Sequence, residues 1–84
     1  MITYILDCRG LDTRAKMHAA LSQKMGFPAW YGGNLDALHD VLSSISRPCK
    51  LLLLGYDEQK LGQGFLAVFQ DSAEENGNFT YELQ

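Results

Sequence analysis

Hydrophobic positions along the chain form short continuous runs and longer helical repeats in a regular order. Runs of β-branched, aromatic and leucine residues predict three strands, at residues 2–6, 51–54 and 79–83. Apolar residues at helical spacing predict three helices between them, at residues 13–25, 34–45 and 65–73. Asp12 or Thr13 is suited to cap the first of these helices, and Asn34 the second. Gly26 is a suitable stop for the first helix.

This order of elements predicts a small layered α/β fold. The sequence is β-α-α-β-α-β, and strands joined through helices run parallel. The run Leu51–Leu54 is too short for a helix and has no polar alternation, which is typical of a strand buried on both faces. We therefore expect a three-stranded parallel sheet in the order 1-2-3, with the leucine strand in the middle. Three main helices pack on this sheet, and residues 56–64 form a loop.

Length and composition indicate one globular domain covering residues 1–84. With 46% hydrophobic and 20% charged residues, the chain has the composition of a folded protein. Its longest apolar run, Leu51–Leu54, is far shorter than the ~20 residues of a membrane span. The N-terminal residues lack the basic segment and cleavage site of a signal peptide. We therefore expect a cytoplasmic protein without a membrane partner.

Charge is divided unevenly along the chain. Residues 1–33 contain four Lys or Arg against two Asp, whereas residues 34–84 contain three Lys or Arg against eight Asp or Glu. Nucleic-acid binding needs a basic cluster that displaces counterions from phosphates, and the sequence contains none. The acidic half therefore predicts either a surface that only aids solubility or one that binds a basic protein.

Cys8 and Cys49 are expected to be free thiols. Cys8 follows the first predicted strand and Cys49 precedes the second, so parallel pairing puts them at opposite ends of the sheet. Six residues of strand separate the two ends by roughly 20 Å. A disulfide needs Cα atoms within about 7 Å of each other, and free thiols are typical of a reducing compartment.

One face of the helix at residues 34–45 carries the candidate chemistry. Asp36, His39, Asp40 and Ser43 gather on it, opposite the leucines. Two like charges one turn apart repel each other, and a solvated helix face more often has Lys or Arg at the second position. Beside adjacent aromatics in a glycine-containing loop, this face has the features of a docking surface for a cationic partner. The alternative is a polar solvent face with loop aromatics folded inward.

Catalytic and metal-binding interpretations are weaker. Asp36, His39 and Asp40 share a helix face, but three ligands from one exposed helix rarely hold a metal without further support. Ser43 and His39 at i and i+4 offer no nucleophile elbow or oxyanion hole, so hydrolysis is not expected. Gly62 and Gly64 are explained by entry into a helix and lack the rest of a phosphate-binding fingerprint. We expect a protein that is not an enzyme and uses no cofactor.

The segment at residues 28–42, Pro-Ala-Trp-Tyr-Gly-Gly-Asn-Leu-Asp-Ala-Leu-His-Asp-Val-Leu, closely resembles the signature of the barstar family. The resemblance follows the element order through the whole chain and includes His18, Leu21 and Phe69. It implies a barstar-like fold and an intracellular inhibitor that binds a basic, barnase-like ribonuclease in a 1:1 complex. An acidic interaction module, or a toxin immunity protein with a partner other than a ribonuclease, stays open as the alternative.

The resemblance also implies which residues bind the partner. Asp40 corresponds to the helix aspartate that enters the catalytic site of the nuclease, and Asp36 to an earlier aspartate. Trp30 replaces a loop tyrosine that packs over the catalytic histidine of the enzyme. His39 and Ile45 depart from the family, which has tryptophans there. The expected partner-binding residues, with Ser43 in place of a threonine and Asp71 in place of a glutamate, are Trp30, Tyr31, Gly32, Asn34, Asp36, His39, Asp40, Ser43 and Asp71.

Overall fold

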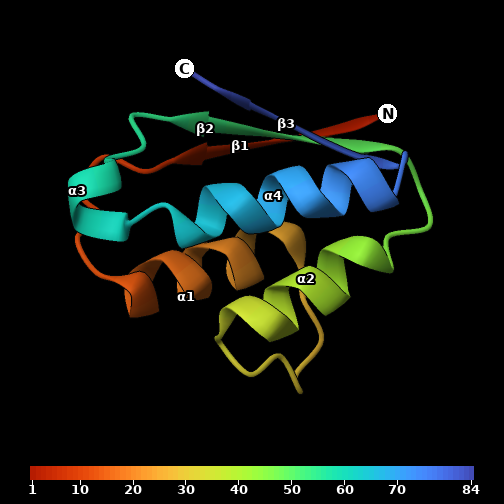
Figure 1. Cartoon of the computed structure of the whole chain (residues 1–84), viewed down its shortest axis with the longest axis horizontal. Coiled ribbons are helices and arrows are strands. Elements are labelled where there is room, and N and C mark those ends of the chain that lie inside the picture. Colours follow the sequence, from red (N-terminus) through yellow and green to blue (C-terminus); the bar gives the residue numbers. More distant parts are fainter.

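A computed structural model describes all residues, 1–84. It contains three strands and four helices in one continuous arrangement (Figure 1). In chain order these are β1 (Ile2–Asp7), α1 (Arg14–Met25), α2 (Leu35–Ser43), β2 (Cys49–Leu54), α3 (Glu58–Leu61), α4 (Gly64–Glu75) and β3 (Phe79–Leu83). No helix is long and apolar enough to cross a membrane.

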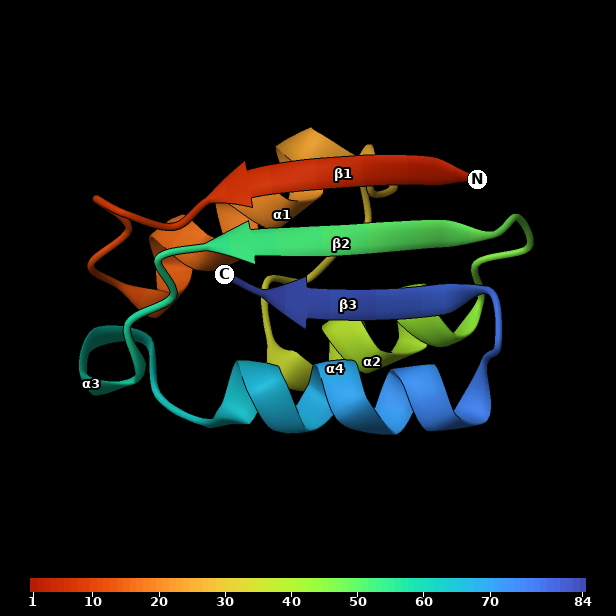
Figure 2. The same ribbon diagram turned by 90° about the horizontal axis from the view of Figure 1, so that it is seen from above.

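The strands form one parallel sheet in the order β1-β2-β3, which confirms the predicted topology (Figure 2). Cys49, the first residue of β2, pairs with Ile2 on one side and Phe79 on the other. The backbone N–H of Cys8 donates to the carbonyl of Leu54, at the far end of the sheet, over 2.8 Å. The two cysteines therefore lie at opposite ends, and both are buried and free as expected.

The helices α1, α2 and α4 all lie on one side of the sheet, and the other side is open (Figure 1). Burial along β2 alternates accordingly: Leu51 and Leu53 are fully buried, whereas Leu52 and Leu54 are only half-buried. The prediction that this strand is buried on both faces is therefore wrong. Four consecutive leucines hide the alternation because the same residue occupies both faces of the pleat.

A fourth helix, α3, replaces part of the loop expected at residues 56–64. Asp57 caps it by accepting a hydrogen bond from the backbone N–H of Gln59 at 2.9 Å. The hydroxyl of Tyr56 donates to the carbonyl of Gly62 at 2.6 Å and closes the turn. The prediction of three helices missed this element because a single turn is too short to show a hydrophobic period.

The core lies between the sheet and the helix layer. Thirteen hydrophobic residues form one buried cluster. Three aromatic rings form its centre: Phe65 and Phe69 of α4 and Phe79 of β3, with ring centroids 6.3 to 6.5 Å apart along the series. Helix α2 and the loop before it pack on this apolar layer.

Candidate functional site: the α2 face and the preceding loop

Helix α2 is fixed at its start by a cap and a close helix contact. The side-chain oxygen of Asn34 accepts from the backbone N–H of Ala37 at 2.8 Å, as expected of an N-cap. The helix α4 begins against the same region, where a Cβ on Gly64 would lie only 2.7 Å from Cδ1 of Leu35. Leu38 and Leu42 are fully buried against the core. The opposite face, with Asp36 and Asp40, is therefore held toward solvent.

The end of α2 is held by a residue that the sequence did not indicate as part of the site. The helix stops at Ser43, two residues before the predicted end. The side-chain amide of Asn76 donates to the carbonyls of Leu42 and Ile45, at 3.0 Å each. The carbonyl of Leu42 also accepts from the backbone N–H of Ile45 at 3.4 Å, and that of Ile45 from the side-chain amide of Asn78 at 3.3 Å. Asn76 thus anchors the C-terminal turn of α2 to the segment that joins α4 to β3.

The two loop aromatics point in different directions. Trp30 is 69% exposed. Tyr31 is half-buried, packs edge-on against Phe27 with ring centroids 4.9 Å apart, and places its hydroxyl 2.5 Å from Nδ1 of His18. Gly33 takes a positive φ of 68°, a conformation that favours glycine, and turns the chain into α2. The loop therefore presents Trp30 outward, and Tyr31 ties it to the body of the protein.

His18 joins this loop to the core. Only 7% of the residue is exposed, and its ring lies 4.7 Å from that of Phe65. Burial lowers the pKa of His18 and raises the pKa of Tyr31 to about 12. The tyrosine hydroxyl therefore keeps its proton, and it shares a hydrogen bond with Nδ1 of the buried imidazole. His18 thus holds the loop through its contact with Tyr31.

A contact between α2 and α4 introduces Glu75 as a member of the site. Oε2 of Glu75 lies 2.6 Å from Nε2 of His39 and 3.4 Å from Oγ of Ser43. Asp71, one turn earlier on α4, is exposed on the same side of that helix. The structure thus places an acidic side chain of α4 against His39 and Ser43 of α2, whereas the sequence pattern indicated mainly the acidic groups of α2.

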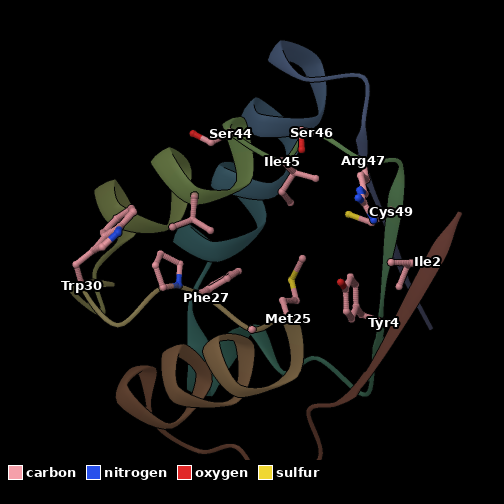
Figure 3. A pocket seen from close by; sticks show the side chains of 13 residues that line it. Ile2, Tyr4, Met25, Phe27, Trp30, Ser44, Ile45, Ser46, Arg47 and Cys49 are labelled. Atoms are coloured by element: carbon pink, nitrogen blue, oxygen red, sulfur yellow. The ribbon is translucent and has the colours of Figure 1, made fainter.

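A cleft of about 380 Å³ flanks the α2 face (Figure 3). Met25 and Phe27 line it from the end of α1 and the following loop, Val41 lines it from α2, and Ile45 lines it from the segment after α2. Trp30 forms part of its wall on the loop side. Ile45 is smaller than the tryptophan that the resemblance implies at this position. Trp30 thus lies between the acidic face of α2 and this largely apolar cleft.

Comparison with known proteins identifies the family. The family described as Barstar (barnase inhibitor) matches the chain over residues 1–84. The chain belongs to the barstar family. It is also 34% identical over 77 residues to "Putative ribonuclease inhibitor YrdF" of Bacillus subtilis (strain 168), a match that covers 84% of this chain and 85% of that protein. At the level of the family, the function is therefore inhibition of a ribonuclease rather than catalysis.

The arrangement of Ser43, His39 and Glu75 is not that of a catalytic triad. Oγ of Ser43 and the Glu75 carboxylate both approach the same nitrogen, Nε2 of His39, at 3.5 and 2.6 Å. A catalytic triad needs the nucleophile and the acid on opposite ring nitrogens, so that the proton can move between them. The structure also contains no group of three or more His, Cys, Asp or Glu side chains placed to hold a metal ion.

Proposed function

We propose that this barstar-family chain inhibits a basic, barnase-like ribonuclease by forming a 1:1 complex. In this complex the exposed face of α2 and the loop before it cover the active site of the nuclease. The observation that carries the proposal is that Asp36, Asp40 and Asp71 are exposed and form no ion pair within the chain. Fixed carboxylates without an internal cation are available for a cation of the partner.

The chemistry of the two surfaces is complementary. A ribonuclease concentrates Arg, Lys and His side chains where it holds phosphates and stabilises charge in the transition state. Carboxylates on a rigid helix can take the place of those phosphates, which excludes the substrate and steers the approach of the two proteins. Of the two aspartates on α2, Asp40 is the one that we place in the catalytic site.

Trp30 is proposed to provide the apolar part of the interface. Aromatic side chains with few rotatable bonds bury a large area at low entropic cost and are common binding hot spots. The backbone around it is fixed by the Asn34 cap and by the Tyr31 hydroxyl. Gly32, Ser43 and His39 complete the proposed contact surface, which corresponds to the residues implied by the family resemblance.

We further propose that the inhibitor acts in the cytoplasm, before the nuclease leaves the cell. Two buried free thiols suit a reducing compartment. An inhibitor placed there would protect the RNA of the cell against a nuclease made in the same cell. Measuring the protein in separate cytoplasmic and extracellular fractions tests this placement.

The inhibition constant for barnase, measured with Asp40→Ala, tests the binding mode. Removing one partner of a buried charge pair costs about 2–5 kcal/mol or more, a range that includes measurements on the barnase–barstar complex of this same family. We therefore expect affinity to fall at least about 30-fold. Glu58→Ala, an exposed carboxylate on α3, is the control and should change affinity little. If Asp40→Ala stays within about threefold of the parent, the proposed binding mode is wrong.

A further inference from the structure

His39 lies on the exposed face of α2 with Asp36 and Asp40, and its contact with Glu75 determines how it can hydrogen-bond to a partner. Nε2 of His39 lies 2.6 Å from the Glu75 carboxylate, and the side chains are 35% and 58% exposed. Ser43 Oγ adds a longer contact to the same carboxylate at 3.4 Å. No hydrogen bond from another group of the chain reaches the second ring nitrogen, Nδ1. Nδ1 is thus the nitrogen left available to a partner.

The identity of the contacting group determines which nitrogen carries the proton. An ionised carboxylate can only accept hydrogen bonds, so Nε2 must be the donor in this contact. In a neutral imidazole, a proton on Nε2 leaves Nδ1 with a lone pair and no hydrogen. His39 held by Glu75 therefore offers a hydrogen-bond acceptor on a face that already contains Asp36 and Asp40.

We propose that Glu75 is a positioning residue of the ribonuclease-binding surface: it holds His39 in the Nε2–H tautomer, so that Nδ1 accepts a hydrogen bond from an N–H donor of the nuclease. This inference rests on the proposed function. It assigns to Glu75 a role exerted through another side chain, and it assigns to His39 the role of an acceptor beside the carboxylates.

The position of the His39–Glu75 pair supports a role in selecting which nuclease the protein binds. His39 stands where the family resemblance implies tryptophan, and an indole N–H can only donate a hydrogen bond. The His39–Glu75 pair joins α2 to α4, which lie side by side in Figures 1 and 2, so residues of two helices hold the His39 ring. A nuclease with an arginine, lysine or backbone N–H opposite this position matches the acceptor. A nuclease with an acceptor there leaves two lone pairs facing each other, which disfavours binding.

Affinity measurements with matched variants test this role. Glu75→Gln and Glu74→Gln each remove one negative charge from neighbouring positions of α4, but only Glu75 contacts His39. Glutamine can donate as well as accept, so it no longer enforces the Nε2–H tautomer. Against the nuclease that the parent inhibits, we expect Glu75→Gln to weaken binding about tenfold and Glu74→Gln less than about threefold.

Repeating both variants in a His39→Ala background separates positioning from direct contact. If Glu75 acts through His39, the difference between Glu75→Gln and Glu74→Gln disappears in that background. Equal effects of the two variants in the parent background would overturn the proposal. A difference that persists without His39 would overturn it as well, because Glu75 would then contact the nuclease itself.

The tautomer is measurable without any nuclease. Long-range ¹H–¹⁵N NMR correlations of the free protein near pH ~8, where histidine is ordinarily neutral, distinguish the protonated from the unprotonated ring nitrogen. We expect Nε2 to carry the hydrogen in the parent, with a shift toward a mixed population in Glu75→Gln. A hydrogen on Nδ1 in the parent would refute the proposal. If Nε2–H is found but Asp40→Ala retains full inhibition, the tautomer stands and the proposed binding mode through Asp40 fails.

Discussion

The phenol oxygen of Tyr31 lies 2.5 Å from Nδ1 of His18, which joins the loop before α2 to the middle of α1. This contact links the loop to a buried residue, whereas the neighbouring Trp30 is largely in solvent. The position of the proposed docking loop therefore depends on a hydrogen bond that lies behind the surface rather than on it.

Replacing Tyr31 by Phe should destabilise the fold. The change keeps the ring but leaves Nδ1 of a buried histidine without its partner, which costs about 1–3 kcal/mol. Urea denaturation measures the loss. Tyr81→Phe is the control, because its half-buried ring stacks on Phe79 and its hydroxyl makes no hydrogen bond within the chain. Comparable losses in the two variants would show that the hydroxyl of Tyr31 contributes nothing specific.

Stability should also fall as the solution becomes mildly acidic, because of His18. Burial lowers the pKa of this histidine from its usual 6.5, so the unfolded chain binds a proton more readily than the folded one. The contribution of His18 is fully present above pH 6.5 and is lost as the pH falls from there toward the lowered pKa of the folded state.

The urea midpoint at pH ~7.5 and at pH ~5.5 measures this effect, in a range above the usual titration of carboxylates. We expect the parent to lose more stability over this range than His18→Gln does. An equal loss in the parent and in His18→Gln would contradict the assignment to His18.

Ser72→Ala should stabilise the protein. Ser72 is fully buried in α4, and its hydroxyl is the one buried side-chain polar atom without a hydrogen-bond partner. A buried group of this kind costs about 1–3 kcal/mol, and alanine is also the better helix former. Ser22→Ala in α1, where the residue is half-buried, isolates the gain in helix propensity. The expected gain in thermal or urea stability at Ser72 exceeds that at Ser22; an equal or smaller gain would show that the hydroxyl is not a cost.

Local features of the fold could be predicted from the sequence because they depend on neighbouring residues. The Asn34 cap and the left-handed Gly26 that ends α1 are confirmed, and of the two candidates for the first cap it is Thr13 that accepts from the backbone of Lys16. The parallel direction of the strands followed from the rule that helical crossovers join parallel strands. The open face of the sheet was missed because the uniform leucines of β2 carry no polar alternation.

The sequence pattern indicated the α2 face of the candidate site and the aromatic loop before it, and the family resemblance added Asp71; neither indicated Glu75 or Asn76. Helical spacing placed Asp36 and Asp40 on one face, and the structure leaves both exposed. The contacts made by Glu75 and Asn76 join positions more than thirty residues apart, to His39 and to the end of α2. No periodicity in a single sequence links such positions, since their proximity results from the packing of α4 against α2.

Association with the nuclease should be accelerated by electrostatic attraction. Eight of the ten acidic residues lie in residues 34–84, and the carboxylates of α2 form no internal ion pair. An acidic surface that approaches a cationic cleft raises the association rate, and salt screens this attraction over a Debye length of about 10 Å at 0.1 M.

Stopped-flow association with barnase, from low salt to about 1 M, should therefore show an on-rate that falls steeply while the off-rate changes much less. Asp36→Asn should lower the on-rate at low salt more than Glu58→Gln, which removes the same charge from α3, and the two variants should converge at high salt as screening becomes complete. Equal effects at low salt would show that only net charge matters. An on-rate independent of salt would place the binding surface away from the acidic face of α2.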